Sequence, residues 1–543
     1  MGNFFEEIFP AVAVCAVVGG VLFGLRRLHE IRRDKSILKD HRVVKSNHSW
    51  YEEPWVNKGH HCSMCEESLS GGFACALCRI KVDEPTCLLF ACKTIPCKVN
   101  PNNSSGRTLK HHWVLGNLEP EDFCCACGDA CGDDLGLNDF WSVSKHGCAW
   151  CSRAVHTDCK RSVRGDCDRG ANRQSVIPPN LVVLKRSGSR TQRSMVIDTL
   201  TPPDDVDDFC PVILIFNPKS GSGAGNRVAK QFSSLLHPAQ VIDVTKCNMR
   251  DSLHWLDEHP TIKARIIIAG GDGTISLVLN DIDALANRPS VALLPLGTGN
   301  DLSRVLNWGT ETDGRLDIRA ATKLLHSIQE ATVQPLDRWT VEITNARRVN
   351  LQPHIKTISM TNYVSIGVDA CVTFGMQSTR DTLPRALSSR FLNKLLFFGY
   401  GTKDIFSRAC KGLEKKIELV LDGAKIELPE CEGLIFLNIS CWGAGVKVWQ
   451  EKENDAMPQR MDDGKFEVFA VESSFHIAKL QVGLSSPLRI GQGSSAVVTI
   501  RSGSIPMQSD GEAWMQQMST ISIGHKCQSL MLKNIPVIQP DEN

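Results

Sequence analysis

The 543-residue chain has almost no net charge and lacks the signatures of several common phosphate-binding proteins. Its 61 Lys and Arg residues balance 60 Asp and Glu residues, which argues against a protein that binds nucleic acid mainly by charge. No Gly-Lys-Ser/Thr ends a Walker loop, which excludes a P-loop ATPase. No HRD and DFG pair is present, which excludes a protein kinase. No EF-hand calcium loop is found either.

The composition is otherwise that of an ordinary folded protein, except for the cysteines. The chain is 42% hydrophobic and 22% charged, and its length predicts several domains. Sixteen of the 23 cysteines precede residue 170. Their spacings are those of metal ligands rather than of a disulfide framework. We therefore expect this half to be reduced and zinc-loaded, in the cytosol or nucleus.

A hydrophobic stretch near the N-terminus predicts a membrane anchor. Residues 8–25, "IFPAVAVCAVVGGVLFGL", carry no charge, and as a helix they would span about 27 Å. Glu6 and Glu7 precede the stretch and many basic residues follow it, so the rest of the chain is expected on the cytosolic side of the endoplasmic reticulum or plasma membrane. A buried core helix is the alternative, and Pro10 leaves room for a re-entrant hairpin.

Eight potential zinc ligands occur between residues 111 and 167, enough for two closed structural sites. They are His111, Cys124, Cys127, Cys148, Cys151, His156, Cys159 and Cys167. The pattern resembles the zinc fingers that bind diacylglycerol and phorbol esters. The resemblance implies interleaved sites, with His111, Cys148, Cys151 and Cys167 forming one and the remaining four forming the other. The gap from Cys127 to Cys148 is long for that family, and Cys125 and Cys131 are alternative ligands. The residues in this gap favour packing over lipid capture.

An earlier, atypical copy spans residues 48–97. Its potential ligands are His48, Cys62, Cys65, Cys75, Cys78, Asp83, Cys87 and Cys97. Asp83 stands nearest the place of the expected second histidine, and a carboxylate can bind zinc. Cys92 is an alternative ligand. The two modules together predict an internal repeat of about sixty residues.

After residues 168–209, which have the composition of a linker, three apolar runs each lead into a glycine-rich loop and then a helix pattern. The loops contain Asn217, Lys219, Ser220, Gly221, Ser222 and Gly223; then Gly270, Gly271, Asp272, Gly273 and Thr274; then Gly297, Thr298, Gly299, Asn300 and Asp301. In a parallel sheet such loops lie at the carboxyl edge, where ligands bind. A cradle of backbone N–H groups for a nucleoside triphosphate is therefore expected.

The motifs "NPKSGSG", "GGDGT" and "PLGTGNDL", in this order, resemble the catalytic domain of diacylglycerol kinases. The likeness continues through "PLDRW", "YVSIGVDA", "MDDGKFEV" and "MQSDGEAW". With the zinc modules and the anchor it extends over the whole chain, and the layout is most similar to the epsilon type. The resemblance implies an ATP- and Mg²⁺-dependent kinase that makes phosphatidic acid from diacylglycerol. Such an enzyme attenuates diacylglycerol signalling and feeds phosphatidylinositol resynthesis.

The expected fold is multidomain. A membrane helix and two zinc-stabilised α+β modules precede an α/β nucleotide-binding domain over residues 210–336. Short alternating strands then predict a β-sandwich over residues 337–540. The resemblance places the active cleft between these halves, with diacylglycerol and membrane lipids as partners and no nucleic acid; protein partners are not predicted.

Phosphoryl transfer requires neutralised phosphates and a base near the acceptor hydroxyl. Lys219 and its loop are the expected phosphate cradle, and Asp272 is expected to hold Mg²⁺ or orient the hydroxyl. Glu512 matches the family's base, with Asp272 as the alternative. Asp510, two residues earlier, would share a strand face with Glu512, or Asp510 and Gly511 would form a β-turn between two strands. Asp462 and Asp463 resemble a second Mg²⁺ site of bacterial relatives or form an ordinary turn. Two other functions remain open: a non-catalytic diacylglycerol-sensing scaffold, or a kinase for sphingoid bases or ceramide.

Overall fold

The computed structural model describes residues 47–535, except for 55–59, 84, 101–103, 106–107, 120, 132–144, 189–192, 298, 313–315, 346–354, 383–409, 444 and 450–457. The chain divides into two compact units, and each is described by itself. The first contains both cysteine-rich modules and the short segments 178–180 and 233–238. The second holds the remaining residues from 174 onward.

The cysteine-rich unit consists of very small sheets. In the first module, β1 (Trp50–Pro54), β4 (Gly71–Cys75) and β5 (Lys81–Val82) form a three-stranded sheet, beside β2 (His60–His61), β3 (Ser68–Leu69) and α3 (Pro85–Thr94). In the second, β8 (Trp113–Leu115), β9 (Lys145–Cys148) and β10 (Ala154–His156) form another. β6 (Ser104–Ser105) pairs with β7 (Thr108–Leu109). Modules of this size bury little apolar surface, so folding depends on their cysteines.

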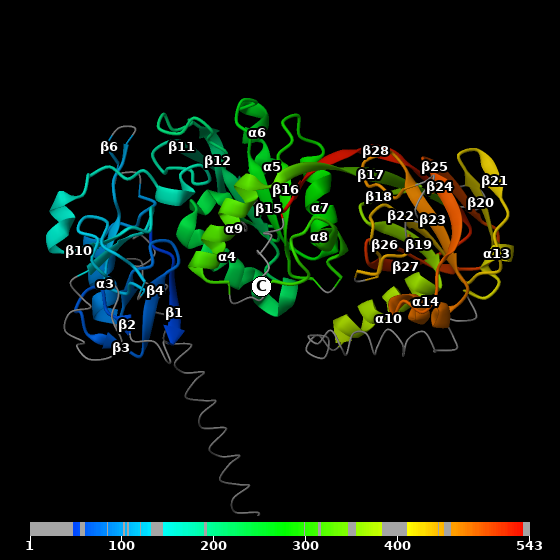
Figure 1. Ribbon diagram of the computed structural model, residues 1–543, viewed down its shortest axis with the longest axis horizontal. Coiled ribbons are helices and arrows are strands. Elements are labelled where there is room, and N and C mark those ends of the chain that lie inside the picture. The colour runs from blue at the N-terminus through cyan, green and yellow to red at the C-terminus, as the bar shows by residue number, and fades with distance from the viewer. Residues whose placement is uncertain are drawn as a thin grey trace, which may run out of the picture. The chain divides into compact units, whose positions relative to one another are not determined.

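The second unit begins with a parallel sheet in the order β14 (Val241–Asp243), β13 (Val212–Phe216), β15 (Arg265–Gly270) and β16 (Ser290–Pro295) (Figure 1). The last three strands are apolar and almost wholly buried, as expected for strands covered on both faces. The α-helices of this half are α4 (Ala224–Leu235), α5 (Met249–Leu253), α6 (Trp255–Glu258), α7 (Asp272–Ile282), α8 (Asp301–Val305) and α9 (Ile318–Glu330).

Part of the segment expected to be a linker is folded. β11 (Val182–Gly188) and β12 (Arg193–Leu200) form an antiparallel hairpin. Ile197 and Leu200 are buried in the core of the α/β half. The serine and basic residues between the two strands gave this hairpin the composition of a linker, which hid the few apolar positions that anchor it.

One long strand joins the two halves of the second unit. β28 (Ser519–Lys533) pairs in parallel with β16 and in antiparallel fashion with β17 (Thr332–Asn345) and β25 (Ser495–Ile500). β18 (Ile355–Met360) pairs with β17. On the other side of β28, β25 pairs with β20 (Ile417–Leu421), which in turn pairs with β21 (Ala424–Ile426). The α/β sheet therefore runs without a break into the β-rich half. Figure 1 shows β28, in red, crossing between them.

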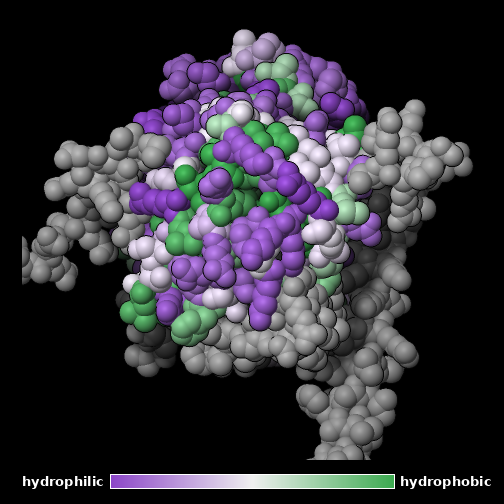
Figure 2. All heavy atoms as spheres, turned by 90° about the vertical axis from the view of Figure 1, so that its right-hand side faces the viewer, coloured by the Kyte–Doolittle hydropathy of each residue, from purple (hydrophilic) through white to green (hydrophobic). Residues whose placement is uncertain are grey.

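A second sheet packs against this extension and forms a sandwich. Its strand order is β24 (Leu488–Gly493), β23 (Phe466–Val471), β22 (Gly433–Leu437), β19 (Tyr363–Gly367), β26 (Ile505–Ser509) and β27 (Glu512–Gln516). Side chains from both sheets share one buried cluster. The helices of this half are α10 (Val368–Thr382), α13 (Leu413–Lys416) and α14 (Ser474–Gln481). Seen from this end, hydrophobic residues gather in the middle of the surface among hydrophilic ones (Figure 2).

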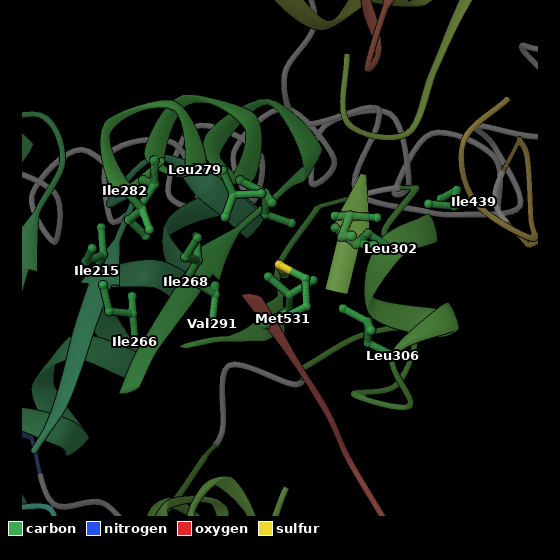
Figure 3. Close-up of a cluster of buried hydrophobic side chains, with 14 of the residues drawn as sticks. Ile215, Ile266, Ile268, Leu279, Ile282, Val291, Leu302, Leu306, Ile439 and Met531 are labelled. Atoms are coloured by element: carbon green, nitrogen blue, oxygen red, sulfur yellow. The ribbon is translucent and has the colours of Figure 1, made fainter. Parts of the chain in front are cut away.

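The core of the α/β half includes a residue from β28, the last described strand of the chain. Ile268 of β15 and Leu279 of α7 belong to the same buried cluster as Met531 of β28. Figure 3 shows Met531 beside Val291, its pairing partner. The C-terminal strand thus completes the core beneath the glycine loops.

Helix α7 connects the loop at Asp272 to the β-rich half. Next to its C-terminal end, Asp283 forms an ion pair of 3.0 Å with Arg338 of β17, and the two side chains are 3% and 0% exposed. Arg338 also donates to Asn280, and Ser529 of β28 donates to Asp283. Removing one partner of such a buried pair typically costs about 3–5 kcal/mol. The position of α7 is therefore fixed at both ends.

The predicted anchor, residues 8–25, lies outside the described residues. Within the part of the chain that the structure describes, no helix has the length and apolar character needed to cross a bilayer.

Candidate active site

The three glycine-rich loops lie at one edge of the parallel sheet. Phe216 of β13 is in register with Ala269 of β15, and Gly270 of β15 with Pro295 of β16. The three strands run in the same direction, so their carboxyl ends carry the loops side by side, as the sequence predicted. Thr298 lies outside the described residues, and the side chain of Ser222 is not described.

Specific contacts lock the loops together. Asn217 Nδ2 donates to Thr274 Oγ1 at 3.1 Å, which joins the first loop to the second. The backbone N–H of Asn300 donates to Asp272 Oδ2 at 3.2 Å, which joins the second to the third. A Cβ on Gly297 would lie 2.7 Å from Gly271 Cα. Glycine is therefore required at positions 271 and 297 because the two backbones approach each other closely.

Three carboxylates lie at or near the second loop. Asp301 and Asp510 are 5% and 6% exposed, and Asp272 is partly buried. Burial, followed by the negative charges of Asp301 and Asp510, raises the pKa of Asp272 to about 7. Hydrogen bonds from Asn362 and from the backbone of Asn300 only partly offset this effect. A group of this kind binds a cation readily, because the cation restores its charged form.

Asp510 binds the backbone of the turn between β18 and β19. Its carboxylate accepts three hydrogen bonds of 2.7–3.1 Å, from the N–H groups of Thr361, Asn362 and Tyr363. The expectation that Asp510 and Glu512 share a strand face is wrong. Asp510 has a φ of 48° in the turn between β26 and β27, and its side chain is buried, whereas Glu512 begins β27 and is exposed.

Glu512 lies across from the second loop. A Cβ placed on Gly273 would be 3.4 Å from Glu512 Oε1. The carboxylate of Glu512 therefore faces the first turn of α7, one residue beyond Asp272. The structure thus brings together Asp272, Asp301 and Glu512 from three distant parts of the sequence.

Asp462 and Asp463 are directed to different partners. Asp462 accepts hydrogen bonds from Arg460 and from Gln334, and Asp463 accepts one from the backbone of Lys465. Among the described residues, neither belongs to a group of three or more potential metal ligands. This arrangement favours the turn that the sequence left open as the alternative to a Mg²⁺ site.

The potential zinc ligands gather into four groups. They are His48, Cys75, Cys78 and Cys97; Cys62, Cys65, Asp83 and Cys87; His111, Cys148, Cys151 and Cys167; and Cys124, Cys127, His156 and Cys159. Distances of 3.4 Å from His48 Nδ1 to Cys78 Sγ and 3.3 Å from Cys65 Sγ to Asp83 Oδ2 are close to the edges of a zinc tetrahedron. Cys92, Cys125 and Cys131 join none of these groups.

Other contacts orient these ligands and connect the modules. His48 Nε2 lies 2.9 Å from Ile95 O, which fixes the ring with Nδ1 toward the cysteines. Arg79 of the first module donates to Cys148 O of the second. Residues 132–144, which make up most of the long gap between Cys127 and Cys148, lie outside the described residues.

Sequence reasoning missed Asn362 and the role of Asp510. Asn362 Nδ2 donates to Asp272 Oδ1 at 3.1 Å, although 90 residues separate them. Neither residue stands in a glycine loop, and no local pattern marks them. The one available signal was the position of "TNY" directly before the strand that carries "VSIG".

Three family models match the chain. The phorbol ester/diacylglycerol-binding (C1) domain matches residues 111–170, the diacylglycerol kinase catalytic domain residues 211–334, and the diacylglycerol kinase accessory domain residues 359–513. The chain therefore carries, in this order, matches to a C1 domain and to the catalytic and accessory domains of diacylglycerol kinases. The catalytic match includes all three glycine loops, and the accessory match contributes Asn362, Asp510 and Glu512.

Relatives in the diacylglycerol kinase family align with most of the chain. "Probable diacylglycerol kinase 3" of Caenorhabditis elegans is 31% identical over 87% of this chain and 62% of its own length. "Diacylglycerol kinase 2" of Arabidopsis thaliana is 28% identical over 92% of this chain and 86% of its own. A solved diacylglycerol kinase from Bacillus anthracis str. Sterne is 20% identical over 60% of this chain and 96% of its own, with a TM-score of 0.38. The chain thus spans less than two thirds of the nematode relative.

The close approach of the Gly271 and Gly297 backbones can be tested by substitution. Gly297→Ala should lower kinase activity at least about tenfold, because the new Cβ must displace the backbone of Gly271 or the side chain of Asn300, 2.8 Å away. Gly524→Ala is the matched control, since a Cβ there meets no atom within 4 Å. Activity and melting temperature are measured for both. Equal, near wild-type activity of the two variants would contradict the packing role of Gly297.

Proposed function

We propose that this chain is an ATP-dependent diacylglycerol kinase, which transfers the γ-phosphoryl group of ATP to the free hydroxyl of 1,2-diacylglycerol and forms phosphatidic acid. The observation that carries the proposal is the group of acidic side chains at the carboxyl edge of the parallel sheet, where the pKa of Asp272 is raised to about 7. Three glycine loops border this group. The matches to the diacylglycerol kinase catalytic and accessory domains support the substrate class.

The described residues fit Mg²⁺. Asp272 and Asp301 supply carboxylate oxygens, the ligands that Mg²⁺ favours. A Cβ on Gly299 would lie 3.1 Å from Asp272 Oδ2 and 3.9 Å from Asp301 Oδ2, so the glycine leaves space beside both. Bound Mg²⁺ would neutralise phosphate charge as it develops during transfer. We assign Lys219 and the loop at residues 220–223 to the phosphates of ATP.

Glu512 is our candidate for the general base. The acceptor hydroxyl must lose its proton as its oxygen bonds to the γ-phosphorus and the bond to the β–γ bridging oxygen breaks. Glu512 would take the proton, and ADP would leave with the electron pair. Its exposed side chain faces Gly273, where a lipid headgroup can reach it. Asp272, held by Asn362 and Asn300, is less free to act as the base.

The expectations for the zinc modules, the membrane anchor and the subtype are proposals as well. We propose that the zinc modules are structural and packed, with Zn²⁺ held firmly in three groups and weakly in the group that contains Asp83. We also propose that residues 8–25 anchor the protein to a membrane with the kinase half in the cytosol. The layout supports the epsilon type of diacylglycerol kinase. Its role would be to attenuate diacylglycerol signals and return the lipid to phosphatidylinositol synthesis.

A lipid panel tests the proposal. Purified protein is incubated with γ-labelled ATP, Mg²⁺ and mixed micelles of diacylglycerol, sphingosine or ceramide. We expect label in phosphatidic acid and at least about a hundredfold less in the other products. Transfer to sphingosine or ceramide instead would favour the alternative lipid kinases. No transfer to any lipid would favour a non-catalytic diacylglycerol-binding scaffold.

Two isosteric substitutions separate the candidate bases. Glu512→Gln removes the proton acceptor, so kcat should fall about 10²–10⁴-fold while the affinity for Mg–ATP is retained. Asp272→Asn should instead raise the Mg²⁺ concentration needed for half-maximal activity, because an amide is a weaker Mg²⁺ ligand than a carboxylate. Single-turnover kinetics over a Mg²⁺ titration measure both effects. The roles reverse if Glu512→Gln keeps a near wild-type kcat and Asp272→Asn loses chemistry at saturating Mg–ATP.

A further inference from the structure

Asn362 lies next to the Asp272 carboxylate and is held there by several hydrogen bonds. Its side chain is 3% exposed. Its backbone N–H donates to Asp510 Oδ1 at 2.7 Å, and its backbone carbonyl accepts a hydrogen bond of 2.8 Å from the N–H of Asn438. Asn438 is itself buried, and it donates through Nδ2 to Thr361 O and Asp337 O. Both peptide groups that flank the Asn362 side chain are therefore fixed.

The two ends of the Asn362 amide have different environments. Nδ2 donates to Asp272 Oδ1 at 3.1 Å, whereas Oδ1 is buried and accepts no hydrogen bond from any residue that the structure describes. When Asp272 is ionised, as it must be to bind a cation, the reverse orientation would place two acceptor oxygens against each other, so the amide presents Nδ2 to the carboxylate. The atom without a partner is therefore the oxygen.

A buried carbonyl oxygen without a donor is unfavourable by about 1–3 kcal/mol. This oxygen is bonded to the same carbon as Nδ2, so it lies beside Asp272, whose carboxylate already has an excess of negative charge around it. A buried acceptor oxygen beside this carboxylate is stabilised when a cation, or a water molecule that hydrates the cation, is bound next to it. Amide carbonyls and carboxylates are common oxygen ligands of hard divalent cations.

We propose that Asn362 is a positioning residue with two tasks: its Nδ2 holds the Asp272 carboxylate in place, and its Oδ1 contributes an oxygen to a divalent-cation site that Asp272 and Asp301 share. Asp510 supports it by fixing the turn at residues 361–363. The β-rich half of the second unit thereby supplies part of the cation site of the α/β half. The identity of the cation as the Mg²⁺ of a kinase rests on the proposed function.

The test compares Asn362→Leu, Asn362→Asp and the control Gln516→Leu. Gln516 is a buried amide on β27 whose side-chain partners are Asn345, Trp514 and Ser519, so its loss should affect stability but not the cation. Calorimetry measures the binding of Mg²⁺–ADP, and thermal unfolding is followed with and without Mg²⁺–ADP. Kinase assays over a Mg²⁺ titration give the half-saturating concentration.

Asn362→Leu should weaken Mg²⁺–ADP binding at least about tenfold and raise the half-saturating Mg²⁺ concentration by a similar factor. Asn362→Asp keeps an oxygen at this place but sets two carboxylates together. It should therefore melt earlier than the wild type without cation and regain most of the difference when Mg²⁺–ADP is added. Gln516→Leu should melt earlier by the same amount in both conditions.

The inference is overturned if Asn362→Leu binds Mg²⁺–ADP and responds to Mg²⁺ within twofold of the wild type. It is also overturned if Asn362→Asp shows a melting deficit that Mg²⁺–ADP does not reduce, since a purely structural residue behaves in that way. If Asn362→Leu fails to fold, Asn362→Asp and Asn362→Ser decide the question. Weakened Mg²⁺–ADP binding without phosphate transfer to diacylglycerol by the wild type would support the cation site and refute the proposed function.

Discussion

The cost of burying negative charge is the constraint on which the site depends. Asp272 stands at the start of α7, where burial, followed by the negative charges of Asp301 and Asp510, raises its pKa to about 7. An uncompensated carboxylate in such surroundings opposes folding, so the protein holds it with fixed donors on two sides, Asn362 and the backbone of Asn300. What remains uncompensated is the charge that a metal–nucleotide complex can neutralise.

The rest of the second unit keeps these groups in place. Helix α7 is fixed near its C-terminal end by the buried pair of Asp283 and Arg338, and the turn that carries Asn362 is fixed by Asp510. Arg338 and Asn362 belong to the β-rich half, and β28 continues the α/β sheet into it. The two halves therefore cannot move independently without disturbing Asp272, so the β-rich half helps to set the position of this carboxylate.

Local patterns predicted the parts of the site that local sequence determines. Apolar runs followed by glycines gave the strand–loop–helix order, and the parallel register then placed the loops at one edge. The contact between Gly271 and Gly297, the turn held by Asp510 and the hydrogen bond from Asn362 were not predictable, because each joins segments that only the tertiary fold brings together. The hairpin at residues 182–200 was hidden by its polar composition.

The most direct test of this account is the number of protons released when Mg²⁺–ADP binds, measured by calorimetry in buffers of different ionisation enthalpy. The carboxyl of Asp272 is protonated below a pH of about 7 and must lose its proton to bind the cation. The wild type should therefore release more protons than Asp272→Asn at pH 6, and the excess should shrink at pH 8. Equal proton release by the two proteins at pH 6 would contradict the claim that the cation binds at Asp272.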